Sequence, residues 1–188
     1  MLTPPFPIVV AIFTEGSKDI FFANYTDTWR LHRKLAFQSL RNFLSGDHLE
    51  VAIYDSFERI TSHLDNLPEE TDNVRRYLQF CMYNTLSKSC FNREYEDIED
   101  KEFVQLSSSF DEFNADLASG TIEDVFPYLM PIWKSSTFKR GEELVTGILD
   151  IVKGHIAKHK ASLDEENPRD IVDHLLIAQM QIESEGTR

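Results

Sequence analysis

The stretch Tyr25–Leu44, YTDTWRLHRKLAFQSLRNFL, decides how the rest of the chain is interpreted. With 3.6 residues per turn, five of its side chains share one helical face, and four of these favour a dry core. The fifth is Arg33, which inside such a face would need an anionic partner, because an unpaired buried charge is costly. That partner could be a carboxylate of the chain or a bound ligand. The five residues are Trp29, Arg33, Ala36, Leu40 and Phe43.

A second row of side chains on the same predicted helix is basic and consists of Arg30, Lys34 and Arg41. It lies about a quarter turn from the first row and is predicted to face water. The chain has a formal net charge of -13, which argues against nucleic acid as a partner. A small basic strip on such a chain suits docking onto an acidic protein.

The composition predicts an all-α protein with about six helices in one domain. Its 188 residues allow a sizeable core, 41% of them are hydrophobic, and only seven each are Gly and Pro. Cys81 and Cys90 lie in an apolar helical stretch without metal-site spacing, which predicts buried, reduced thiols. No apolar run approaches the roughly 18 residues of a membrane span.

Apolar periodicity and helix-boundary residues locate six helices. The third carries apolar residues on nearly all sides, which predicts a position in the middle of a bundle. The fourth carries an aromatic stripe with Phe103, Phe110 and Phe113, which is most often plain core and otherwise the roof of an apolar ligand pocket. The predicted ranges are 25–44, 49–64, 73–91, 103–117, 136–163 and 167–178.

Three other features allow more than one interpretation. His155 and His159 have the i, i+4 spacing of zinc ligands, but no third ligand is evident, so they are predicted to face solvent. The acidic run Glu94–Asp100 is predicted to be a solvated face. The apolar segment 119–137 is predicted to be a loop that must pack on something.

The hexapeptide Trp29–Lys34, WRLHRK, resembles the W-R/K-x-x-R-K/R motif in the C helix of cytochrome P-450, the family of haem-thiolate monooxygenases. The approach Asp19–Tyr25 and the segments Cys90–Asn92 and Asp124–Leu129 are similar, in the same order, to segments of that family. The closest resemblance is to animal microsomal members of the steroid 17α-hydroxylase type. The chain is therefore identified as an internal segment, 1–188, that runs from before the C helix to the H helix.

The resemblance implies a partial cytochrome P-450 fold, one incomplete domain without the sheet, the oxygen-activating helix or the Cys-ligand loop. It assigns Trp29 and Arg33 to a haem propionate. It assigns the basic row Arg30, Lys34 and Arg41 to docking of the electron donor. The residues proposed on the same basis to contact substrate are Phe22, Phe110, Phe113 and Leu117.

The implied reaction is hydroxylation of a small lipophilic substrate, steroid-like or xenobiotic, with O2 and electrons from an NADPH-dependent flavoprotein reductase. The full-length protein is expected on the cytosolic face of the endoplasmic reticulum membrane, although this segment carries no anchor. The axial Cys motif F-x-x-G-x-x-x-C is absent, so the segment alone, with no catalytic residue or metal ligand, is expected to be inactive. The alternative is a cofactor-free helical interaction module in which Arg33 pairs with one of the 32 carboxylates.

Overall fold

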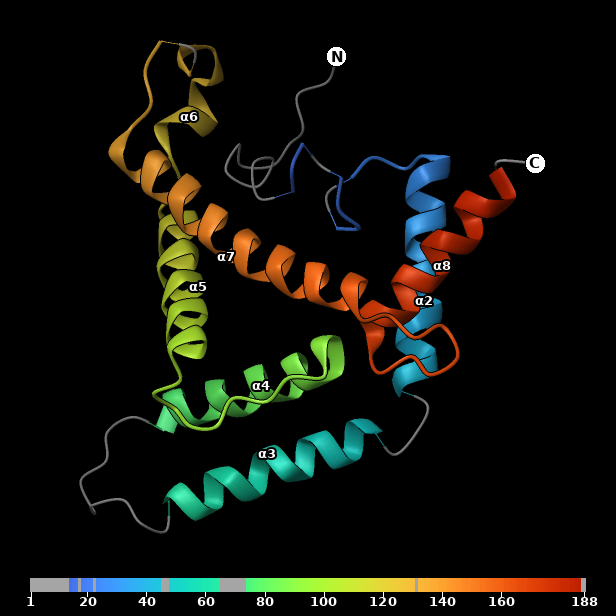
Figure 1. Cartoon of the computed structure of the whole chain (residues 1–188). Helices are drawn as coiled ribbons and strands as arrows, with labels where there is room; N and C mark the ends of the chain where they lie inside the picture. The colour runs from blue at the N-terminus through green and yellow to red at the C-terminus, as the bar shows by residue number, and fades with distance from the viewer. Residues whose placement is uncertain are drawn as a thin grey trace. The chain divides into compact units, whose positions relative to one another are not determined.

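The computed structural model describes residues 14–16, 18–21, 23–44, 48–64, 74–130 and 132–186. Within these residues the chain forms seven α-helices and a short 3-10 helix, with no strand (Figure 1). The predicted all-α class is confirmed, and all six predicted helices are present. The helices are α2 (Asp27–Leu44), α3 (His48–Leu64), α4 (Val74–Phe91), α5 (Lys101–Ser119), α6 (Ile122–Val125), η1 (Pro127–Leu129), α7 (Ser136–Ala161) and α8 (Ile171–Gly186).

The structure differs from the prediction most clearly at the start of the last helix and in the segment between α5 and α7. The last helix begins at Ile171 rather than at 167, because the Asp170 carboxylate accepts the backbone N–H of Asp173 at 2.9 Å and so caps the helix. The helices α6 and η1 lie in a segment predicted to be a loop. An element as short as α6 shows no apolar period, and the Thr121 N–H donating to the Asp124 carboxylate at 3.0 Å helps to begin it.

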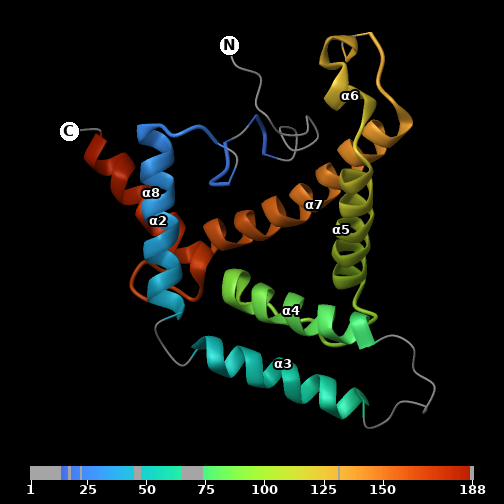
Figure 2. The ribbon, with the colours of Figure 1, turned by 180° about the vertical axis from the view of Figure 1, so that it is seen from behind.

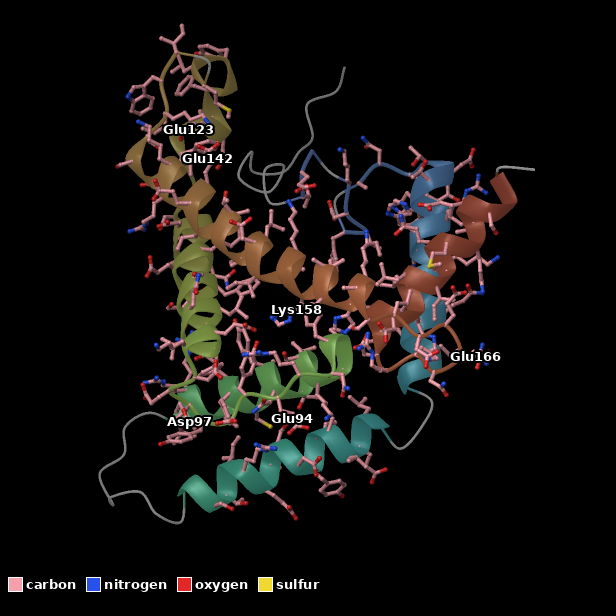
Figure 3. The ribbon with its side chains drawn as sticks, in the orientation of Figure 1. Glu94, Asp97, Glu123, Glu142, Lys158 and Glu166 are labelled. Atoms are coloured by element: carbon pink, nitrogen blue, oxygen red, sulfur yellow. The ribbon has the colours of Figure 1, made fainter. Side chains whose placement is uncertain are left out.

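The chain divides into two compact units, and the first comprises Met1–Arg33 and Gln105–Lys153. In this unit α5 and α7 pack on a shared apolar core, and Arg140 of α7 forms an ion pair with Asp116 of α5. Glu123 of α6, labelled in Figure 3, is buried and accepts the backbone N–H of Ser135 at 2.5 Å, which ties α6 to the start of α7. The core consists of Phe113, Phe138 and Val145 with Met130, Leu144 and Leu149 around it.

The second unit comprises Lys34–Val104 and Gly154–Arg188. The helices α3 and α4 run antiparallel side by side in both views (Figures 1 and 2). Phe103 is fully buried, and the rings of Phe80 and Tyr83 meet its ring edge-on with centroids 5.2 and 5.5 Å away. Tyr95 follows α4 and is fastened to it, because its N–H donates to Asn84 Oδ1 at 2.6 Å.

The prediction that α4 is buried on all sides is wrong for the described residues. One side packs on α3, but Leu78, Met82 and Leu86 are exposed. Apolar residues around a whole helix indicate which faces can be buried, whereas the neighbours present decide which faces are buried.

The prediction of a solvated acidic face between Glu94 and Asp100 holds only in part. Glu94, labelled in Figure 3, forms ion pairs with Arg59 of α3 at 2.5 Å and with Lys88 of α4 at 2.6 Å. The Asp100 carboxylate accepts the backbone N–H of Glu102 at 2.8 Å at the start of α5. Two members of the acidic run therefore hold helices in place.

Candidate functional site

The first two turns of α2 carry the motif residues Trp29–Lys34, and the helix begins after a hydroxyl cap. The backbone N–H of Trp29 donates to Thr26 Oγ1 at 3.1 Å, so Thr26 caps the helix. Asp27 lies in the first turn, where a negative charge is favourable, and forms an ion pair with Arg30. These two contacts stabilise the first turn of α2.

The indole of Trp29 is fixed from two sides. Its Nε1–H donates to the backbone carbonyl of Ile20 at 2.9 Å, a bond that spans the turn before the helix. The ring of Tyr25 packs against it with centroids 5.2 Å apart and planes inclined by 49°. The half-buried indole is therefore held at its N–H and along its ring.

Arg33 lies one helical turn after Trp29, with its guanidinium carbon 5.1 Å from the centre of the indole ring. The prediction that Arg33 lies in a buried apolar face is wrong, because Arg33 and Leu40 are both exposed. The indole of Trp29 stabilises the positive charge of Arg33 by a cation–π contact, while the guanidinium stays exposed to solvent. Among the described residues, no carboxylate forms an ion pair with Arg33.

A hollow of about 440 Å³ lies beside the motif, within the first unit. It is lined by residues of the segment before α2 and of the first turns of α2, among them Trp29 and His32. The motif therefore borders an open depression whose other lining residues include Gly16, Lys18, Asp19 and Thr26.

The basic row on α2 is exposed, as the sequence predicts. Arg30, Lys34 and Arg41 are all accessible, and Arg30 also lies over the ring of Tyr25, 5.6 Å from its centre. Arg30 is thus partly neutralised by Asp27, while Lys34 is accessible one turn further along.

The four predicted substrate contacts are not brought together as a described pocket. Phe113 belongs to the core shared by α5 and α7, and Phe110 is half-buried on α5. Phe22 and the side chain of Leu117 lie outside the described residues. Phe113 is therefore a core residue, which is the first of the two interpretations of the aromatic stripe. That the four residues contact substrate stays a prediction.

The prediction that His155 and His159 face solvent is wrong. Each is only 7% exposed. His155 Nε2 lies 2.8 Å from Glu102 Oε1, and His159 Nε2 lies 2.6 Å from Asp170 Oδ2. Glu102 lies at the start of α5 and Asp170 just before α8, and both belong to the second unit, so the i, i+4 spacing on α7 could not reveal these partners.

The buried cluster around His159 has the residue types of a metal site but is internally satisfied. His159, Asp170 and Asp173 offer ligand atoms within 4.8 Å of one another. However, His159 Nδ1 donates to the His155 carbonyl at 2.9 Å, and Arg169 donates to both Asp173 oxygens at 2.6 and 2.9 Å. Burial opposes ionisation of Asp173, but the hydrogen bonds from Arg169 prevail and lower its pKa. The cluster is therefore a structural network between helix ends.

Cys81 and Cys90 are free thiols and only half-buried. Burial raises the pKa of both, and the nearby charge of Asp170 raises that of Cys90 further. Because the thiolate is the reactive and metal-binding form, neither cysteine is set up as a nucleophile or a metal ligand.

The segment between α5 and α7 presents apolar side chains to solvent. Val125, Tyr128 and Ile132 are exposed, and Trp133 is half exposed. The predicted need for a packing partner is thus not met within the described part of the chain. In the part of the chain that the structure describes, no helix is both long enough and apolar enough to cross a membrane.

Comparison with known proteins shows which family this chain resembles in sequence and fold. The sequence model of the Cytochrome P-450 family matches residues 7–188. Cytochrome P-450 1A1 of Chelon auratus is 29% identical over 174 residues, which cover 87% of this chain and 33% of the relative. Steroid 17-alpha-hydroxylase/17,20 lyase of Squalus acanthias is 24% identical over 184 residues, 97% of this chain and 36% of the relative.

The fold is similar to that of a zebra fish cytochrome P-450 solved with progesterone. The TM-score is 0.81 at 24% identity, over 94% of this chain and 40% of that one. This likeness confirms the predicted partial fold. The chain spans about a third of the length of the curated relatives it matches.

Proposed function

The chain belongs to the cytochrome P-450 family, and from this membership we propose that it forms the propionate-binding side of a haem site in a monooxygenase. The reaction is hydroxylation of a small lipophilic compound, steroid-like or xenobiotic, with electrons from an NADPH-dependent flavoprotein reductase. When bound, the haem supplies the activation of O2, while residues of this chain bind and orient it. We further propose that 1–188 is part of one domain, with Phe22, Phe110, Phe113 and Leu117 near the substrate.

The observation that carries this proposal is the exposure of Arg33 and its stacking on Trp29. Its guanidinium is exposed, stacked on Trp29 and not in an ion pair with a carboxylate among the described residues. A planar, exposed guanidinium suits bidentate binding of a carboxylate such as a haem propionate. The cofactor-free alternative is stated with Arg33 paired to a carboxylate of the chain, and no such pair occurs in the described part of the structure.

Replacing Arg33 by alanine in the whole protein should weaken haem retention more than replacing Arg30. The first change removes a charge-assisted hydrogen bond to the propionate, which typically contributes about 1.5 to 3 kcal/mol. The second removes a mostly exposed charge whose pair with Asp27 contributes about 0 to 1 kcal/mol. Haem content per purified protein measures the difference. Equal loss in both variants would count against Arg33 as the propionate ligand.

We also propose that Arg30, Lys34 and Arg41 receive the reductase. All three are exposed along α2, and a basic strip on a chain of net charge -13 attracts an acidic partner locally. Contact with the endoplasmic reticulum membrane at its cytosolic face is proposed for the apolar side chains between α5 and α7. The support is the exposure of Tyr128 and Trp133, since aromatic residues with a polar tip favour membrane interfaces, and the exposure of the apolar Ile132 beside them.

Reversing two charges of this strip, with Arg30→Glu and Lys34→Glu together, should slow reductase-supported turnover about tenfold at low salt. Added salt should slow the wild-type reaction, because charges are screened over about 10 Å at 0.1 M ionic strength. Turnover driven by peroxide bypasses the reductase and should be nearly unchanged.

The matched control reverses two exposed lysines on another helix, Lys158→Glu with Lys160→Glu on α7. It changes the net charge equally and should leave reductase-supported turnover within about twofold of wild type. A fall of both routes together in the Arg30 and Lys34 variant would indicate damage to the haem site and would remove the support for docking.

A further inference from the structure

The segment that joins α7 to α8 begins with an exposed serine. Helix α7 ends at Ala161, and Ser162 is the first residue of a stretch without helix or strand that leads to α8 at Ile171 (Figure 1). Ser162 Oγ donates to the backbone carbonyl of Lys158 at 3.1 Å and accepts from Arg169 Nη1 at 3.0 Å. The hydroxyl is therefore accessible to solvent and lies against a cation.

Three acidic residues follow this serine closely. Asp164, Glu165 and Glu166, the last of them labelled in Figure 3, stand at the second, third and fourth positions after Ser162, and all three are exposed. No other Ser or Thr of the sequence is followed by acidic residues at all three of these positions. A protein kinase with a basic substrate cleft would favour such a serine and reject others, because complementary charge selects the partner.

Arg169 offers a receptor for a phosphate on Ser162. Its Nε and Nη2 donate to the two carboxylate oxygens of Asp173 at 2.6 and 2.9 Å, and this bidentate pair fixes the plane of the guanidinium. The remaining amino group, Nη1, is the one that donates to Ser162 Oγ. A phosphate brings a charge of about -1.5 to -2 and three acceptor oxygens. It can therefore bind Nη1 while Asp173 keeps the other edge of Arg169.

The end of α7 by itself disfavours a negative group, because the last carbonyls of a helix carry partial negative charge. Lys158 and Lys160, both exposed in the last turn of α7, offset this effect. Arg169 adds a cation in direct contact, and charge-assisted hydrogen bonds are about twice as strong as neutral ones. The acidic residues of the joining segment are exposed, so that their repulsion is screened by salt. The surroundings of Ser162 therefore favour a bound phosphate.

We propose that Ser162 is a phosphorylation site for an acid-directed protein kinase and that Arg169 binds the resulting phosphate. Ser162 Oγ attacks the γ-phosphorus of ATP, the bond from that phosphorus to the oxygen bridging to the β-phosphate breaks, and ADP leaves. The hydroxyl proton passes to the catalytic carboxylate of the kinase. The phosphate then joins the end of α7 to the start of α8 through Arg169. This inference goes beyond the proposed function and does not depend on haem binding by Arg33.

Phosphate incorporation tests the recognition step. The whole protein is incubated with MgATP and a purified protein kinase that requires acidic residues after its target serine, and mass spectrometry locates the phosphate. Ser162 should be modified, and the double variant Glu165→Gln with Glu166→Gln should be modified about tenfold more slowly. Absence of phosphate at Ser162, or an equal rate in the double variant, would overturn the assignment.

The matched control is Ser108→Ala. Ser108 is also exposed and is followed by Asp111 and Glu112 at the third and fourth positions, but it lies inside α5, where the backbone is held in a helix. Ser108→Ala should leave the incorporation of phosphate unchanged, whereas Ser162→Ala should abolish most of it. The reverse result would place the modified serine on α5 and would overturn the proposal.

Amide hydrogen exchange of residues 162–170 tests the role of Arg169. Phosphorylation should slow this exchange several-fold in the wild-type protein, because the phosphate ties the joining segment to Arg169. Arg169→Lys keeps a positive charge for Asp173 but lacks the second edge of the guanidinium, so phosphorylation should then change exchange by less than about twofold. The control Lys160→Ala removes a neighbouring exposed charge and should preserve the slowing. Unchanged exchange in the phosphorylated wild type, or equal slowing in Arg169→Lys, would overturn the assignment of Arg169 as the receptor.

Discussion

Replacing Asp170 by alanine should lower the free energy of unfolding by about 3 to 5 kcal/mol, because one partner of a buried hydrogen-bonded pair is removed. Asp170 is 0% exposed, and its Oδ2 lies 2.6 Å from His159 Nε2. Its Oδ1 accepts the backbone N–H of Asp173, which caps α8. The substitution therefore leaves a buried imidazole nitrogen without its hydrogen-bond partner and a helix N-terminus without its acceptor. Chemical denaturation followed by far-ultraviolet circular dichroism measures the loss.

Two further variants make this test specific. Asp150→Ala removes an exposed carboxylate from α7 and should change the free energy of unfolding by less than about 0.5 kcal/mol. Asp170→Asn keeps an acceptor oxygen of similar shape and should be less destabilising than Asp170→Ala. If Asp170→Ala were no more destabilising than Asp150→Ala, the cluster at the start of α8 would not contribute to stability.

Replacing Phe103 by alanine should also destabilise the protein by about 3 to 5 kcal/mol, the usual range for loss of a buried aromatic ring. Phe103 is 0% exposed, and three aromatic rings surround it. Two belong to α4, Phe80 and Tyr83, and the third is Tyr95 in the segment after α4. The cavity would therefore open where the start of α5 packs on α4. The midpoint of denaturant unfolding, with an unchanged slope, measures this loss.

The matched control is Phe37→Ala on α2, which removes the same side chain from a position that is 68% exposed. It should change the free energy of unfolding by less than about 0.5 kcal/mol. Similar losses for Phe37→Ala and Phe103→Ala would mean that the packing around Phe103 does not determine the stability of this unit.

The sequence by itself determined the helices and the family. Helix formation follows from local periodicity and capping, so the six long helices could be predicted. The motif Trp29–Lys34 could also be recognised from the sequence, because its six residues are consecutive. The short helix α6 could not, because four residues are too few to show an apolar period.

Only the tertiary structure decided the environments of the charged side chains. Arg33 is exposed on an indole rather than buried, and His155 and His159 are buried beside Glu102 and Asp170 rather than in solvent. In each case the contact that matters depends on where a side chain lies in space. Helical spacing specifies which residues of one helix share a face. It carries no information about which acceptor from a distant part of the chain meets that face, and a buried polar group takes whichever partner the packing brings to it.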